Sequence, residues 1–219
     1  MGQYTKDKKY YMPDIIFPEF NKNGSVDITL TKEEFEVCDY ESHRRWSNTK
    51  SGIYGSGMIN SIQDPCRAER IGLYGEMAYA KIFADKVDCV YRWLGDKQDF
   101  ILFDNKVDVK CASNDRQVGL IYYINPEGKY IHLDKDIYVF GNLLEENLIE
   151  KRCKVQLFGW CLFDDIKSRN EVRPARFKAS PHFNLEMPYS LLNSIYTLHS
   201  LYACINKYDT EVKQYEFGL

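Results

Sequence analysis

Two carboxylates and one ammonium group lie close together in the stretch from Asp99 to Lys110. Two short strands joined by a turn at residues 104–105 predict a β-hairpin in which Asp99 faces Lys110 and Ile101 faces Asp108. Because side chains alternate between the two faces of a strand, Asp99, Asp108 and Lys110 then share one face. Carboxylate oxygens are preferred ligands of Mg²⁺, and a lysine ammonium is a mobile charge that can hold a phosphate. The pattern therefore favours a site for a divalent metal and a phosphate.

The opposite face of the same hairpin is entirely apolar, which predicts that it packs against a core. Its members are Phe100, Leu102, Val107 and Val109. The alternative is an ordinary exposed face with a cross-strand ion pair between Asp99 and Lys110, which would contribute at most about 1 kcal/mol to stability.

A helix expected over residues 67–84 supplies a third carboxylate, Glu76. The interior of this helix contains two glycines, Gly72 and Gly75, each of which costs roughly 1 kcal/mol of helix propensity. Small residues are tolerated where a helix approaches a sheet closely, and Glu76 lies beside them. The helix is thus expected to bring Glu76 toward the sheet that contains the hairpin.

Gly75-Glu76 on a helix, followed by Asp99 and then Asp108-Val109-Lys110, resembles the motif of the PD-(D/E)xK nuclease superfamily. The resemblance covers residues 67–111. It implies an α/β (α+β) fold with a restriction-endonuclease-like αβββαβ core, in which helices flank a central mixed sheet. Two features depart from the pattern: Gln98 stands where the motif has proline, and residues 113–136 are more typical of strands than of the expected core helix.

The resemblance also implies an activity, a cofactor and a partner. It implies a Mg²⁺-dependent deoxyribonuclease, with Mn²⁺ able to substitute, which hydrolyses phosphodiester bonds. DNA is the expected substrate and partner, and RNA is the less favoured alternative. Asp99 and Asp108 would bind the metal, and Glu76 would bind a second metal or orient a water on the first. Lys110 would position or activate the attacking water. Many such proteins dimerise, which makes a homodimer possible, and small versions are common in bacteriophages. The alternative is a non-catalytic nucleic-acid-binding or structural protein on the same fold.

Contacts with a polyanion must come from local basic surfaces, because the chain has a net charge of −3. The segment 167–182 is basic and has two prolines, which predicts a loop rather than a helix. A helix starting at the capping box Thr31-Lys-Glu-Glu34 carries further basic residues. The expected nucleic-acid contacts are Arg169, Arg173, Arg176, Lys178, Arg44 and Arg45. A solvated surface is the alternative for both segments.

The remaining composition narrows the class of protein. No apolar run reaches the roughly 20 residues of a membrane span, and the first residues lack the apolar stretch of a signal peptide. Seven scattered cysteines without paired spacing indicate reduced thiols, which favours the cytoplasm, or the host cytoplasm for a phage protein. We expect one domain over 1–219, with an N-terminal extension and helix (1–66), a catalytic core (67–163), and a basic loop with a C-terminal helix (164–219).

Overall fold

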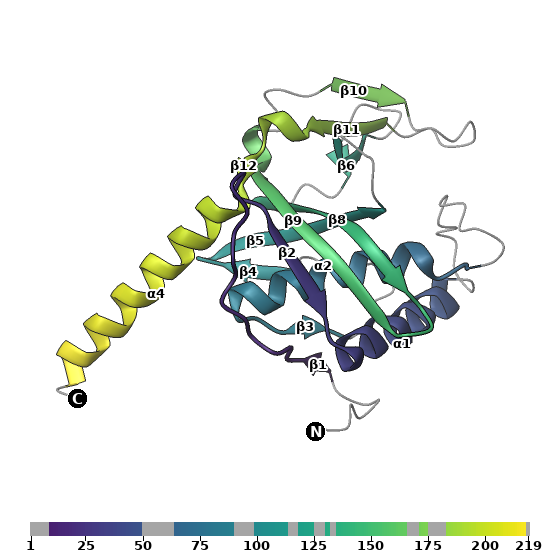
Figure 1. The fold of residues 1–219 in the computed structure, drawn as a ribbon. Coiled ribbons are helices and arrows are strands. Elements are labelled where there is room, and N and C mark those ends of the chain that lie inside the picture. The colour runs from purple at the N-terminus through teal and green to yellow at the C-terminus, as the bar shows by residue number, and fades with distance from the viewer. Residues whose placement is uncertain are drawn as a thin grey trace.

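A mixed six-stranded sheet forms the centre of the fold (Figure 1). The computed structural model describes residues 9–49, 64–89, 99–113, 118–124, 130–131, 135–165, 171–174 and 183–217. The order across the sheet is β12 (Asn193–Ser194), β9 (Arg152–Leu162), β8 (Ile137–Asn147), β5 (Asn105–Ser113) and β4 (Phe100–Leu102), with β2 (Val26–Leu30) also on β9. Strands β5 and β8 are parallel, whereas the other neighbours in this sheet are antiparallel. Strands β2 and β12 share the outer edge of β9.

Two helices pack beside this sheet, so the expected mixed sheet with flanking helices is present (Figure 1). Helix α2 (Arg67–Phe83) contacts β5, β8 and β9, and α1 (Lys32–Thr49) packs against α2. The predicted capping box opens α1: the Glu34 carboxylate accepts from the backbone N–H of Thr31 at 2.7 Å, and Thr31 Oγ1 accepts from that of Glu34 at 3.3 Å. Glu34 is buried and also pairs with Lys81 of α2 at 2.6 Å, which joins the two helices.

The small residues of α2 allow the close approach that the sequence predicts. A Cβ atom added at Gly75 would lie 2.6 Å from the Cβ of Cys111 on β5, so only glycine fits there. At Gly72, one turn earlier, no atom lies within 4 Å of such a Cβ. Gly75 therefore sets the distance between α2 and β5, and Glu76 is the next residue along the helix.

The hairpin of β4 and β5 has the predicted faces but not the predicted register. Phe100 pairs with Val107 and Ile101 pairs with Lys106, so the turn lies at Phe103-Asp104 instead of residues 104–105. Both turn residues have positive φ (51° and 61°), as in the two-residue turns that favour hairpins. The prediction followed the turn propensity of Asn; in the structure the Phe103 ring packs on the core and lies 6.4 Å from the Tyr202 ring.

The pairing shift is two residues, so each side chain keeps its face. The four apolar residues of the core face are buried: Phe100, Leu102, Val107 and Val109. Extending the observed register places Asp99 beside Asp108 rather than opposite Lys110. The backbone N–H of Asp99 donates to the carbonyl of Val107 at 3.0 Å. The predicted Asp99–Lys110 and Ile101–Asp108 pairs are therefore wrong, although the shared face is confirmed.

The described part of the connection between β5 and β8 contains strands. The sequence predicts this, because residues 113–136 are more typical of strands than of the core helix of the family. Strands β6 and β7 belong to a second, four-stranded antiparallel sheet in the upper part of Figure 1. The prediction of a basic loop at 167–182 is wrong for residues 171–174, which pair with β11 as a strand. The order of this sheet is β10 (Glu171–Pro174), β11 (Phe183–Pro188), β6 (Val118–Ile124) and β7 (Tyr130–Ile131).

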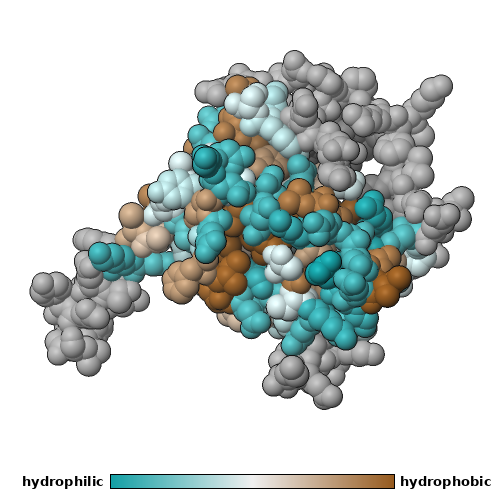
Figure 2. Space-filling view, viewed as in Figure 1, coloured by the Kyte–Doolittle hydropathy of each residue, from teal (hydrophilic) through white to brown (hydrophobic). Residues whose placement is uncertain are grey.

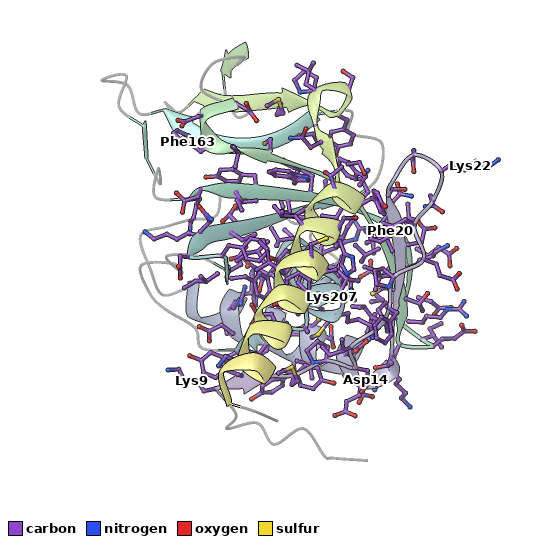
Figure 3. All side chains as sticks on the ribbon, turned by 90° about the vertical axis from the view of Figure 1, so that its left-hand side faces the viewer. Lys9, Asp14, Phe20, Lys22, Phe163 and Lys207 are labelled. Carbon is purple, nitrogen blue, oxygen red and sulfur yellow. The ribbon has the colours of Figure 1, made fainter. Side chains whose placement is uncertain are left out.

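Elements near both ends of the described chain contact the same core as the central sheet. Strand β1 (Tyr10–Tyr11) pairs with β3 (Val87–Asp88), and a short 3₁₀ helix η1 (Tyr189–Leu191) precedes the last helix, α4 (Ile195–Phe217). The C-terminal helix that the sequence predicts within 164–219 is therefore present, and it begins at Ile195. Helix α4 projects away from the sheet in Figure 1 and crosses the front of the molecule in the view of Figure 3. In its first turns the His199 ring packs beside Phe20, with ring centroids 5.4 Å apart.

The core and surface agree with a chain of ordinary globular composition. All seven cysteines are free, as expected. The face in Figure 2 shows hydrophilic side chains interspersed with apolar patches. Among the described residues, no helix has the length and apolar character to cross a membrane.

Candidate functional site

Glu76, Asp99, Asp108 and Lys110, here called the hairpin site, interact electrostatically with one another. Lys110 Nζ lies 2.6 Å from Asp108 Oδ2, and this carboxylate oxygen is shielded from solvent. Asp99 comes directly before β4, and Lys110 is two residues after Asp108 on β5. The charges of Glu76 and Asp108 both act on Asp99, and those of all three carboxylates act on Lys110. The structure thus brings together all four residues that the sequence predicts as catalytic.

Asp99 is held in place by a backbone group at the edge of β5. Its Oδ2 accepts a hydrogen bond from the N–H of Val109 at 2.7 Å. Strand β4 has only three residues, so within the described part of the chain it stops pairing with β5 at Val107. The Asp99 carboxylate takes the next N–H along this edge instead. Because β4 is short, the Val109 N–H bonds to the Asp99 carboxylate, which positions that side chain.

The carboxylates of the hairpin site repel one another. Burial raises the pKa of Asp99 well above its usual value, and the charges of Glu76 and Asp108 raise it further. Lys110 and the Val109 N–H offset only part of this effect. Such a concentration of negative charge disfavours ionisation of the last carboxyl group, and a bound cation would relieve it. The donor set fits a hard divalent metal in its chemistry.

Lys110 keeps its proton at neutral pH. Burial lowers the pKa of Lys110, but the charges of Asp108, Asp99 and Glu76 outweigh burial and raise it above the ordinary lysine value. Its side chain is nevertheless 42% exposed, so the ammonium group can contact a ligand from solvent. These properties suit a hydrogen-bond donor and a positive charge, and they do not suit a general base.

The arrangement is not a complete cage for a metal. Across the described ranges, no three side chains of His, Cys, Asp or Glu are placed to hold one ion together. Two protein cations lie among the carboxylates instead: Lys110 beside Asp108, and Arg45, whose Nη1 donates to Glu76 Oε1 at 3.4 Å. A metal at the hairpin site would take its remaining ligands from water and substrate, as Mg²⁺ commonly does.

Of the predicted nucleic-acid contacts, two lie on α1 and both form ion pairs within the protein. Arg44 Nη2 lies 2.7 Å from Glu41 Oε2, one turn earlier on the same helix. Arg45 is 16% exposed and bonds to Glu76 and to the carbonyl of Asp88. Neither belongs to a simply solvated face. Arg169, Arg176 and Lys178 lie outside the described residues, and Arg173 is in β10 without a described side chain.

Sequence reasoning missed a thiol–imidazole pair at the start of α2. Cys66 Sγ lies 3.2 Å from His43 Nδ1, and His43 Nε2 lies 3.8 Å from Asp39 Oδ1. The spacing of Asp39 and His43 on one helix face is a local signal, but only the fold brings Cys66 to them. Cys66 is completely buried, and burial raises the pKa of its thiol. A nucleophilic cysteine needs the opposite shift and access to substrate, so this pair serves packing.

A cavity of about 290 Å³ lies beside that pair. Its lining comes from α1, α2, the approach to α2 and the β8–β9 turn, and it includes Asp39, His43, Asp64, Arg70, Glu36, Lys151, Phe35 and Leu148. Its buried cation, Arg70, already bonds to Asp39, Asp64 and Glu146. The cavity does not include any member of the hairpin site, so it is separate from the predicted chemistry.

No protein-family model, curated protein or solved structure matches this chain. The functional argument therefore rests on the residues of the hairpin site and their electrostatics.

Proposed function

We propose that the protein is a metal-dependent nuclease that hydrolyses phosphodiester bonds, with DNA as its substrate and with a restriction-endonuclease-like core. The observation that supports the proposal is that Glu76, Asp99, Asp108 and Lys110 lie within electrostatic reach of one another, and that burial and the charges of Glu76 and Asp108 raise the pKa of Asp99. Clustered carboxylates with a perturbed pKa are typical of functional sites. The parallel pairing of β5 with β8 is also compatible with such a core.

In this proposal Asp99 and Asp108 would hold Mg²⁺ or Mn²⁺, and Glu76 would bind a second metal or orient a water on the first. A bound metal of this kind polarises a phosphoryl oxygen and lowers the pKa of a coordinated water. Asp99 is preoriented by the Val109 N–H, and Asp108 by its ion pair with Lys110. Such fixed ligands reduce the reorganisation that binding requires.

Lys110 would orient the attacking water or the scissile phosphate. Because its pKa is raised, it donates hydrogen bonds and does not accept the proton of the water. That proton would pass to solvent or to a phosphate oxygen. The positive charge of Lys110 would also offset the negative charge that develops on the phosphate in the transition state.

The decisive experiment is a cleavage assay with Mg²⁺ or Mn²⁺ on linear, circular, branched and single-stranded DNA, with RNA for comparison. We expect the wild type to cleave DNA and Asp108→Asn to lose about 10³-fold in rate, because a metal ligand is removed. Glu150→Gln removes an exposed carboxylate far along the chain, at the β8–β9 turn, and is the matched control.

Two results would contradict the proposal. Folded wild-type protein that cleaves no substrate with either metal is not a nuclease of this kind. Equal cleavage by wild type and Asp108→Asn would mean that the activity does not come from the hairpin site. DNA binding without cleavage would support the alternative, a non-catalytic nucleic-acid-binding protein.

A further inference from the structure

Arg45 connects α1 to the hairpin site through two bonds. Its Nη1 donates to Glu76 Oε1 at 3.4 Å, and its Nη2 donates to the backbone carbonyl of Asp88 in β3 at 3.2 Å. The Arg45 side chain is 16% exposed and that of Glu76 is 12% exposed, so solvent screens this pair only in part. The guanidinium is therefore a fixed positive charge at the border of the carboxylates.

The two cations near the hairpin site hold their carboxylates differently. Lys110 approaches Asp108 to 2.6 Å, whereas Arg45 approaches Glu76 only to 3.4 Å. A distance of 3.4 Å exceeds the normal range of a charge-assisted hydrogen bond. Arg45 is thus the more distant of the two cation partners, and the Asp88 carbonyl can retain the guanidinium after Glu76 has moved.

We propose that Arg45 is an internal counter-cation that competes with the divalent metal for Glu76, and that it thereby sets the metal concentration at which the hairpin site loads. The inference rests on the proposed function, because it assumes that Glu76 binds a metal. Before loading, the guanidinium compensates the charge of Glu76. After loading, the metal compensates it, and Arg45 remains anchored on the carbonyl of Asp88. Arg45 acts through Glu76 and is a positioning residue.

The experiment is a calorimetric titration of the full-length protein with Mn²⁺ in the absence of nucleic acid. We expect Arg45→Gln to lower the Mn²⁺ dissociation constant by about fivefold, because a partly buried ion pair no longer competes with the metal for Glu76. Arg152→Gln is the control, since Arg152 is an exposed arginine that pairs with the exposed Glu150 at 3.3 Å. We expect its dissociation constant to stay within about twofold of the wild-type value.

A merely structural role for Arg45 gives a different result. Loss of a structural contact lowers stability and leaves Mn²⁺ affinity unchanged or weaker, and either outcome in folded Arg45→Gln overturns the inference. If Arg45→Gln does not fold, Arg45→Met is the second variant, because methionine keeps an apolar stem. Its expected Mn²⁺ affinity is the same as that of Arg45→Gln. If neither variant folds, Arg45 is a structural clamp and the inference is wrong.

Failure of the proposed function has its own readout. Asp99→Asn serves as the reference, because heat from a metal at the hairpin site must disappear in this variant. If the wild type and Asp99→Asn bind Mn²⁺ equally, the site holds no metal and the proposed function itself fails. If the Asp99-dependent heat is present but Arg45→Gln does not change the affinity, only the inference about Arg45 fails.

Discussion

Two groups of carboxylates and cations, both in contact with α2, show how the same residue types can have different roles. At the beginning of the helix, Arg70 is 3% exposed and bonds to Asp64, to Glu146 at 3.0 Å and to Asp39 at 3.3 Å. We call these four residues the Arg70 cluster. Burial lowers the pKa of Arg70, but its hydrogen bonds to Asp64 and Glu146 outweigh burial and raise it. Each charge in this cluster has a direct partner.

The hairpin site lies about two turns further along α2. There Lys110 pairs with Asp108 and Arg45 pairs with Glu76. Burial and the charges of Glu76 and Asp108 nevertheless raise the pKa of Asp99. The Arg70 cluster joins α1, α2 and the β8–β9 hairpin, and its geometry is that of a structural element. In the proposed function, the raised pKa of Asp99 marks the position where a cation would complete the hairpin site, whereas the paired charges of the Arg70 cluster stabilise the fold.

The strongest test of this contrast is removal of the central cation of the Arg70 cluster. Arg70→Gln should lower the free energy of unfolding by about 3 kcal/mol or more, because it leaves partly buried carboxylates without their partner. Chemical denaturation measures this loss. Arg67→Gln is the control: Arg67 is 44% exposed and has Glu146 as its partner at 3.3 Å, so its loss should cost at most about 1 kcal/mol. Equal effects of the two variants would refute a structural role specific to Arg70.

Substitution of the two glycines of α2 should change stability by a smaller amount. Gly75 packs closely against β5, whereas Gly72 faces open space. Gly75→Ala should destabilise the fold by about 1–3 kcal/mol, because the new methyl group would collide with Cys111. It should also displace Glu76 and weaken metal binding. Gly72→Ala should instead stabilise by about 0.5–1 kcal/mol, since the methyl group meets open space and alanine favours helix. Thermal unfolding of both variants measures the two changes in stability. If both substitutions stabilise the protein, the close approach of α2 to β5 at Gly75 is contradicted.

The smallest expected effect concerns the repulsion at the hairpin site itself. In the presence of EDTA at pH 7, Asp99→Asn should raise the free energy of unfolding by about 1 kcal/mol, because it removes a disfavoured charge while the amide oxygen can still accept from the Val109 N–H. Denaturation curves of the two proteins measure the difference. A clear loss of stability in Asp99→Asn would mean that the charge of Asp99 is compensated, as in the Arg70 cluster.

The same pair of proteins gives a pH dependence of known sign. The pKa of Asp99 is higher in the folded than in the unfolded protein, so between these two values the folded state holds more protons. The stability of the wild type relative to Asp99→Asn should therefore fall as the pH rises from about 4, the usual aspartate value, and become constant above the folded pKa. A relative stability that rises with pH would contradict the raised pKa.

Much of the site was predictable because its determinants are local. Alternation along β5 assigns Asp108 and Lys110 to one face whatever the pairing, and the glycines of α2 predict the close approach that brings Glu76 near. The capping box of Thr31 and Glu34 defines the start of α1 through contacts three residues apart. These patterns hold in the structure because each depends only on neighbouring residues.

Other features depend on contacts between segments far apart in the sequence. The hairpin turn is at Phe103-Asp104 because Phe103 packs near Tyr202 of α4, which outweighs the local preference of Asn105 for a turn. Residues 171–174 form a strand because β11 pairs with them, despite the proline and the charges that predict a loop. Propensity alone could not reveal either partner.

By itself, the sequence determined which side chains share the polar face of the hairpin and which helix carries the third carboxylate, because period and spacing are properties of a single segment. Only the tertiary structure decided that Asp99 bonds to the Val109 N–H and that Arg45 reaches Glu76. It also decided that Arg70 is compensated while Asp99 is not. Compensation of a charge depends on distance and burial, which arise only when separate segments pack together.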